Sequence, residues 1–215
     1  MNKKLQTIIM LAMTFLCDTS FSQTRDSLTA KTYLDLVLNL VSTNLNYGNA
    51  NSTLNDYKRS VLGAQIGVSF QAGITPTFSL VPEFYFTMKG GKLKANNPLT
   101  TGESTVRLYA FELPVLARFH FSNFHINGGP SIAYNFSGTQ KIADRYIDWR
   151  YKQFEAGMQL GGGYTFHTKR ERIGVDLRYN YGLTNISYGR EMHNRSFIVS
   201  VHISKPWKTN PLASR

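Results

Sequence analysis

Hydrophobicity alternates with a period of two along nearly the whole chain from residue 32 onward. Apolar side chains occupy every second position in long stretches, and small or polar side chains occupy the positions between them. Because successive residues of a β-strand point to opposite faces, this pattern predicts strands. Eight stretches show it: 34–40, 62–72, 78–88, 107–121, 124–136, 154–166, 173–183 and 197–203.

Two further features of these stretches point to a closed barrel in a membrane. Most are as long as the roughly 9–11 residues that a tilted strand needs to cross a bilayer, and their even number allows a barrel without an open edge. Long polar connections follow the first, third, fifth and seventh stretches, and tight turns follow the others. The sequence therefore predicts an all-β fold, an eight-stranded antiparallel up-and-down transmembrane β-barrel with long outer loops and short periplasmic turns.

The two faces of the alternation differ in a way that assigns them to lipid and lumen. One face is apolar and carries aromatic residues toward the strand ends, as the interfacial girdles of outer-membrane barrels do. The other face is mostly Gly, Ser, Gln and Asn with a few charges of both signs. A soluble barrel such as a lipocalin would present a face dense in charge to water, and this polar face does not supply one. We therefore expect lipid outside and a packed polar lumen.

The first 22 residues match a targeting segment. Lys3 and Lys4 precede an apolar run, and small residues stand at alternate positions before Gln23, which predicts a secretory signal peptide. A lipoprotein that begins at Cys17 is the alternative, and the bulky residues before that cysteine disfavour it. We expect the protein in the outer membrane of a Gram-negative bacterium, exported by a cleaved signal peptide. The expected boundaries are 1–22 signal peptide, 23–31 N-terminal tail, 32–207 outer-membrane β-barrel and 208–215 C-terminal tail.

Charged residues on the polar face predict a network inside the barrel. Buried charges must be paired, so we expect ion pairs and hydrogen bonds that fill the lumen, with Arg118 and Arg178 each bound to a carboxylate. An acid/base pair of a carboxylate and a histidine is the functional alternative, and no motif in the sequence fixes one. The expected structural network consists of Asp35, Glu83, Glu112, Arg118, Glu155, Asp176, Arg178 and His202.

Candidate chemistry outside this network is sparse. His125 or His193 with a loop serine could imitate the rim site of a lipid-modifying outer-membrane enzyme. Gly161 to Gly163 are not followed by the lysine and Ser/Thr of a phosphate loop, and we expect them to serve close packing or a bend. The five histidines show no metal-ligand spacing. We therefore predict no catalytic residue, no cofactor and no metal, and a protein that is not an enzyme.

The chain is strongly basic, with a net charge of +11. Nucleic acid is not an expected partner, since an exported barrel meets little of it. The nearest anions are outer-leaflet lipopolysaccharide phosphates, although loop basicity is equally compatible with plain solvation. We expect outer-membrane lipid and lipopolysaccharide as partners, with an envelope protein as a further candidate. The loop and strand-end cations are Lys58, Arg59, Lys92, Lys94, Lys141, Arg145, Arg150 and Arg190.

Four segments resemble the PorT-like family of outer-membrane β-barrels, which is common in Bacteroidota. They are FSLVPEFYFTMKGGKL (78–93), FELPVLARF (111–119), INGGPSIAY (126–134) and RYNYGLTNI (178–186). The resemblance implies an eight-stranded barrel, and one family member is tied to a secretion and gliding apparatus, a role that membership alone does not transfer. Our hypothesis is a non-enzymatic structural or interaction component of the envelope. The alternatives are a small-solute channel and a lipid-modifying enzyme.

Overall fold

The computed structural model describes residues 32–143, 145–148, 151–167 and 172–206. The predicted signal peptide (1–22) and the predicted tails (23–31 and 208–215) lie outside the described residues. Among the described residues, no helix is both long enough and apolar enough to span a bilayer.

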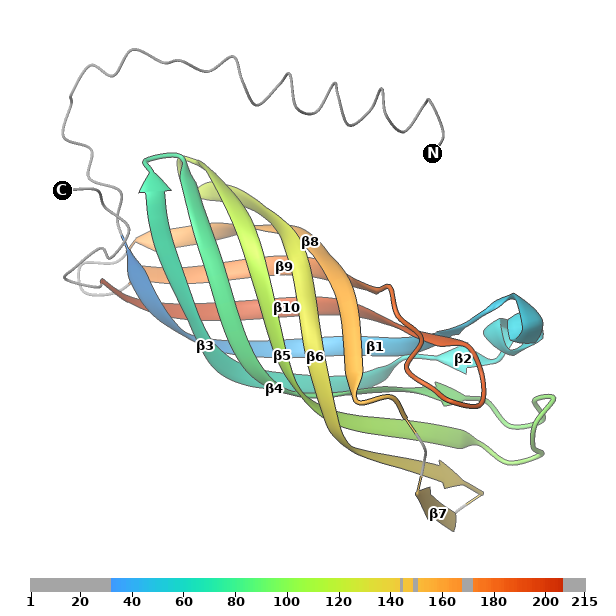
Figure 1. Ribbon diagram of the computed structural model, residues 1–215. Coiled ribbons are helices and arrows are strands. Elements are labelled where there is room, and N and C mark those ends of the chain that lie inside the picture. The colour runs from blue at the N-terminus through green and yellow to red at the C-terminus, as the bar shows by residue number, and fades with distance from the viewer. Residues whose placement is uncertain (1–31, 144, 149–150, 168–171, 207–215) are drawn as a thin grey trace, which may run out of the picture.

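Eight long antiparallel strands form a tilted barrel (Figure 1). Neighbours in sequence pair with one another, β10 pairs with β1, and pairing of β4 with β5 completes the ring. This arrangement confirms the predicted eight-stranded up-and-down barrel. The strands are β1 (Tyr33–Tyr47), β3 (Val61–Thr75), β4 (Phe78–Leu93), β5 (Ser104–Phe121), β6 (Phe124–Ile142), β8 (Phe154–His167), β9 (Arg172–Gly182) and β10 (Met192–Pro206).

The connections separate into a short-turn end and a long-loop end. Two-residue turns at 76–77 and 122–123 join β3 to β4 and β5 to β6, whereas the connections of 48–60 and 94–103 at the other end are long. The 48–60 connection contains the 3₁₀ helix η1 (Asn49–Asp56) and the short strand β2 (Lys58–Arg59). β7 (Arg145–Asp148) pairs with the end of β6.

Several strands extend further than the sequence pattern predicted. β5 begins at Ser104 and β6 continues to Ile142, beyond the predicted stretches 107–121 and 124–136. Past the lipid belt, neither face of these strands needs apolar residues, so the alternation stops while the hydrogen-bonded ladder continues. The same reason explains why the sequence did not reveal β2 and β7.

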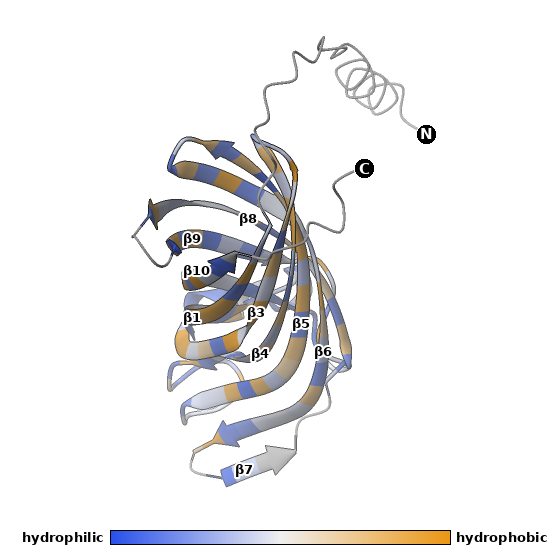
Figure 2. Ribbon diagram, turned by 90° about the vertical axis from the view of Figure 1, so that its left-hand side faces the viewer, coloured by the Kyte–Doolittle hydropathy of each residue, from blue (hydrophilic) through white to orange (hydrophobic). Residues whose placement is uncertain are grey.

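The alternation places most apolar side chains outside and most polar side chains inside, as predicted, while a few apolar side chains on the inner face, such as Val37, Val81 and Leu116, are buried. Figure 2 shows orange and blue segments alternating along the strands. Adjacent residues of β1 illustrate the contrast, since Leu40 is 58% exposed and Asn39 is 5% exposed. Ala72 departs from the predicted pattern, because it is buried although it stands at a lipid-facing position; the strand register shifts between Gly73 and Thr75.

Candidate functional site

The inward side chains of β4 follow the lumen from one end to the other. Ser79 lies at the short-turn end, Glu83 and Tyr85 follow, Lys89 comes next, and Leu93 lies at the long-loop end. All five are buried. The lumen is therefore polar over most of its length and becomes apolar near the long loops.

Arg178 on β9 lies at the centre of the polar part. Its Nη1 lies 2.5 Å from Glu83 Oε2 on β4 and 3.4 Å from Gln159 Oε1 on β8. Its Nη2 donates to the Tyr85 hydroxyl at 3.1 Å and to Ser200 Oγ at 2.8 Å. The Tyr85 hydroxyl in turn donates to Glu83. One guanidinium thus ties together side chains from four other positions around the barrel.

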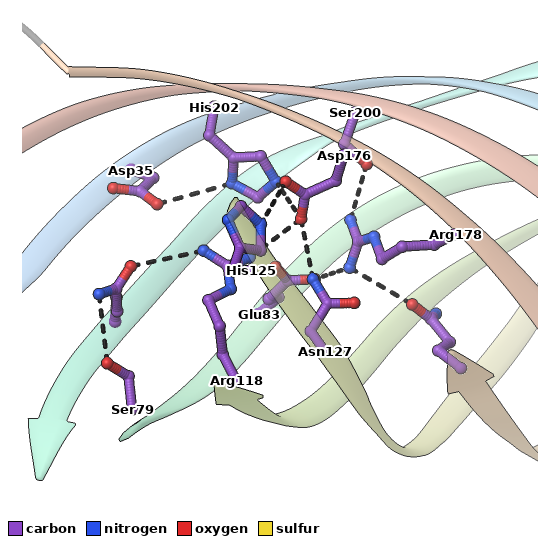
Figure 3. Close-up of polar contacts among 12 residues, drawn as sticks. Asp35, Ser79, Glu83, Arg118, His125, Asn127, Asp176, Arg178, Ser200 and His202 are labelled. Atoms are coloured by element: carbon purple, nitrogen blue, oxygen red, sulfur yellow. Dashed lines mark hydrogen bonds and ion pairs between the residues drawn. The ribbon is translucent and has the colours of Figure 1, made fainter. Parts of the chain in front are cut away.

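Asp176, two residues earlier on β9, gathers nitrogen atoms from three other strands (Figure 3). They are Arg118 Nη2 at 3.0 Å, His125 Nε2 at 2.8 Å, Asn127 Nδ2 at 2.9 Å and His202 Nε2 at 3.6 Å. The other ring nitrogen of His202 lies 3.5 Å from Asp35 Oδ2. The His202 imidazole therefore sits between carboxylates of β9 and β1.

The charged side chains nearer the long loops are stabilised in two ways, by an ion pair and by hydrogen bonds from neutral amides. Lys89 Nζ lies 2.5 Å from Glu155 Oε2, and both residues are buried. Glu112 instead accepts amide hydrogen bonds from Gln65 at 3.2 Å and from Gln159 at 2.9 Å. Neutral amide donors satisfy this carboxylate, so an arginine or lysine partner is not required for it to be hydrogen-bonded.

Glycine on β8 makes room for these long side chains. A Cβ at Gly161 would lie 2.6 Å from Arg178 Cγ, and a Cβ at Gly163 would lie 2.3 Å from Asp176 Oδ1 and 2.8 Å from His125 Nε2. Such approaches are too close for any side chain. Gly161 and Gly163 thus serve the close packing expected from the sequence, because they leave the space into which the polar network fits.

An apolar cluster fills the long-loop end of the lumen. η1 supplies Leu54 and the β9–β10 connection supplies Ile186, so two loops fold over the barrel end. Burial raises the pKa of the Tyr47 phenol, which lies beyond the apolar belt, to about 12. The cluster, called the outer plug below, consists of Leu45, Tyr47, Leu54, Leu93, Val106, Leu108, Ile186 and Met192.

The structure brings the eight predicted network residues into the lumen, all of them buried. Lys89, Tyr85 and Gln159 were also expected inside and join the network, and His125, considered for a rim site, joins it as well. Sequence reasoning did not single out the other partners that complete the network, although the same alternation placed them on the inner face: Gln65, Gln71, Asn127 and Ser200. The outer plug was also missed; its signal was the apolar character of inward positions at the long-loop ends of the strands.

The two histidines considered for a rim site lie far apart. His125 is the second residue of β6, just after a short turn, and is buried against Asp176. His193 is the second residue of β10, at the long-loop end, and its Nε2 lies 3.1 Å from Glu191. Within the described residues, no group of three or more His, Cys, Asp or Glu side chains could hold a metal ion.

The short-turn end opens into a polar hollow of about 220 Å³. His120 Nε2 lies 2.9 Å from Ser79 Oγ at its wall. The Arg172 guanidinium lies over the Tyr33 ring, 4.2 Å from its centroid, and donates to Gln71 at 3.1 Å. Gln71 also contacts the polar network above the hollow, so the hollow ends at that network.

A family model described as "outer membrane protein beta-barrel domain" matches residues 21–188 of the chain. A comparison with curated proteins found no match.

Three solved structures are similar to this chain in fold. Neisserial surface protein A shares 12% identity, covers 82% of this chain and 97% of its own, and has a TM-score of 0.47. Ail, the attachment invasion locus protein of Yersinia pestis, shares 9% identity with coverages of 81% and 99% and a TM-score of 0.45. The outer membrane protein OprG from Pseudomonas aeruginosa shares 11% identity with coverages of 81% and 94% and a TM-score of 0.46.

Proposed function

Because the chain belongs to the family of outer membrane proteins with a β-barrel domain, we propose that it is a non-enzymatic structural or interaction component of the envelope. The family places the protein in the outer membrane. In this proposal the barrel anchors the protein through a packed lumen, and the loops, rim and turns carry its contacts with other envelope components.

The observation that carries this proposal is the filling of the lumen at two levels. The polar network crosses the barrel through Arg178 and Asp176, and the outer plug fills the end beneath the long loops. An eight-stranded barrel is only wide enough for side chains to fill its interior, whereas water-filled porins use about 16–18 strands. The polar network and the outer plug both fill the lumen, which argues against the alternative of a small-solute channel.

Conductance of the purified barrel in a planar bilayer tests the proposal. We expect no stable, porin-sized steps. The alternative predicts reproducible steps that a bulky substitution at Gly161, which stands directly opposite Arg178 on the neighbouring strand, abolishes. Observing such steps and their loss in Gly161→Leu, with folding confirmed by electrophoretic mobility before and after heating, would replace our proposal with the channel.

The positions of the histidines support the non-enzymatic part of the proposal. His125 is enclosed in the lumen network, and His193 pairs with Glu191. Ser187 in the β9–β10 connection accepts backbone hydrogen bonds from Gly189 at 3.2 Å and Arg190 at 3.5 Å. A lipid-product assay on the wild type and on His193→Ala tests this part; a product that disappears in the variant would contradict it.

We propose in addition that lipopolysaccharide surrounds the outer rim of the barrel, and that the chain belongs to a PorT-like subgroup of the family. We also propose that residues 1–22 are removed on export. Mass analysis of the protein from isolated outer membranes tests this removal of residues 1–22. The expected mature chain begins at or near Gln23, and a folded protein that retains residues 1–22 would contradict cleavage.

A further inference from the structure

The polar hollow at the short-turn end has a wall drawn from much of the barrel. Its lining comes from β1, β3, β4, β5, β8 and β9 and from the turns at 76–77 and 122–123. Aliphatic hydroxyl groups make up a large part of this wall, and a hydroxyl can both donate and accept a hydrogen bond. The wall therefore suits a polar ligand rather than an apolar one. The hydroxyl groups belong to Thr75, Ser79, Ser122 and Thr165.

Basic side chains stand in this wall without acidic ones. Arg172 contributes a guanidinium, and His120 and His167 contribute imidazoles. Within the described residues, no Asp or Glu lines the hollow. An anion that enters it thus meets a guanidinium and hydroxyl groups, and no carboxylate of the described wall repels it.

The Arg172 guanidinium has uncharged partners in direct contact. It lies over the Tyr33 ring, and its Nη2 donates to Gln71. Its Nη1 is buried and has no hydrogen-bond acceptor among the described residues. Leaving a buried donor unpaired costs free energy. Arg172 therefore keeps the capacity for one more hydrogen bond, and an acceptor in the hollow would supply it.

The carboxylate whose field acts on Arg172 is that of Asp35. These two side chains do not form an ion pair, because Asp35 Oδ2 faces His202 Nδ1 at 3.5 Å instead. Arg118 and Arg178, deeper in the lumen, each have a carboxylate at contact distance. Arg172 differs from both in lacking such a partner within the described part of the chain.

The size of the hollow restricts its ligand. The volume of about 220 Å³ is below the range of about 300–1,000 Å³ for sites that enclose a drug-sized molecule, so the hollow accommodates a small molecule or the end of a longer one. Charge narrows the choice further. One guanidinium without a carboxylate partner matches a singly charged anion better than a phosphate group, which carries about two charges at neutral pH.

We propose that the hollow binds a carboxylate group presented from the periplasm, which belongs to a small organic acid or to the C-terminal end of a peptide. The inference deepens the proposed function, on which it rests in taking the short turns to face the periplasm. Arg172 turns its guanidinium toward the ligand and supplies a charge-assisted hydrogen bond. Hydroxyl groups such as those of Ser122 and Thr165 donate to the remaining lone pairs of the carboxylate.

Binding to the purified full-length barrel in phosphatidylcholine nanodiscs tests the proposal, with the NMR signals of the five histidine rings as the readout. His120 reports on the hollow and is assigned with His120→Gln. His193, at the long-loop end, is the internal control. The probes are an N-acetylated tripeptide of alanine with a free carboxyl end, the same peptide with an amidated end, sodium acetate and inorganic phosphate.

Four variants locate the site. Arg172→Gln removes the guanidinium, Arg172→Lys keeps a positive charge, and Thr165→Leu narrows the hollow without changing its charge. The matched control is Lys205→Gln. It removes an exposed cation near the same end of the barrel, and Lys205 does not line the hollow.

We expect the peptide acid to shift the His120 signal and to leave the His193 signal unchanged. The amidated peptide should bind about tenfold more weakly, because a hydrogen bond to a charged group is lost. Arg172→Gln should weaken binding of the peptide acid about tenfold for the same reason. Thr165→Leu should also weaken it, Arg172→Lys should weaken it less than Arg172→Gln, and Lys205→Gln should not change it. Acetate that binds as tightly as the peptide acid would identify a small organic acid as the ligand, and tighter binding of the peptide would identify a peptide end.

No shift of the His120 signal with the peptide acid or acetate, or equal binding of the peptide acid and its amide, would overturn the proposal. Unchanged binding in both Arg172→Gln and Thr165→Leu would do the same, as would tighter binding of inorganic phosphate than of either carboxylate. The comparison of the two peptides uses the wild type alone, so it decides the matter even where Arg172→Gln folds poorly. These results are independent of bilayer conductance, so the carboxylate site can fail while the closed lumen stands, and the reverse.

Discussion

The two ends of the lumen are filled by different kinds of side chain. Toward the short turns, Arg178, Asp176 and their partners form a network of ion pairs and hydrogen bonds. Beneath the long loops, the outer plug is made of Leu, Ile, Val, Met and Tyr side chains. Both parts are buried, and both lie within the same ring of strands.

The difference shows which requirement each part places on its residues. A buried ion loses its hydration and is tolerated only with a well-placed partner, so each network residue depends on a particular neighbour. An apolar side chain needs only a surface of complementary shape. The network is therefore sensitive to the loss of one partner, while the outer plug is sensitive to the loss of volume.

The largest effect is expected from Arg178→Ala in the network. This change leaves Glu83 buried without its cation, and such a loss typically destabilises by about 3–5 kcal/mol. The free energy of unfolding in urea, measured with the barrel in phospholipid vesicles, checks this. Replacing both partners, Arg178→Met with Glu83→Leu, is the matched control and should recover most of the stability. Wild-type stability in both Arg178→Ala and Arg118→Ala would indicate a hydrated lumen.

A somewhat smaller effect is expected one residue away, on the opposite face of the same strand. Leu177 is 52% exposed and faces lipid near the middle of β9. An arginine there should destabilise the barrel by about 2–4 kcal/mol, as it does near the bilayer midplane of other barrels. Unfolding in vesicles is again the measurement. A tolerated arginine at both Leu177 and Val201 would mean that the two faces are assigned wrongly.

Leu108→Ala tests the outer plug with a change of volume alone. The side chain is fully buried, so its truncation should cost about 2–3 kcal/mol, at the low end for such substitutions because the plug lies at the barrel end, where loops can relax. The loss should be independent of salt, since no charge is removed. Leu108→Met, which keeps the volume, should cost less than about 1.5 kcal/mol. A larger loss in the methionine variant than in the alanine variant would contradict this account.

The sequence was sufficient to predict the barrel because lipid and lumen impose opposite polarity on successive residues. That constraint shows that Leu177 faces lipid and Arg178 faces the lumen, without any knowledge of their neighbours. It does not reveal which partners meet across the lumen. The pairs Arg178–Glu83 and Lys89–Glu155 join residues 95 and 66 positions apart, and their contact depends on strand tilt and register.

The outer plug was beyond sequence reasoning for a related reason. Leu54 and Ile186 lie in loops where no periodicity applies, and they reach the lumen only because η1 and the β9–β10 connection fold over it.

The smallest effect is expected from an arginine outside the lumen, and it sharpens the contrast with Arg178. Arg195 on β10 lies over the ring of Tyr181, its cross-strand neighbour, with 3.4 Å between the guanidinium carbon and the ring centroid. Its Nη1 donates to the Gly182 carbonyl at 2.5 Å.

Because Arg195 is only partly buried and pairs with no carboxylate within the described residues, Arg195→Ala leaves no buried charge behind. The loss should be about 1 kcal/mol or less, the range of exposed cation–π contacts, and Arg195→Lys should retain part of it. Both variants should be compared with Arg178→Ala in the same urea titration. An Arg195→Ala loss as large as that of Arg178→Ala would mean that uncompensated burial of a carboxylate is not what makes the network sensitive.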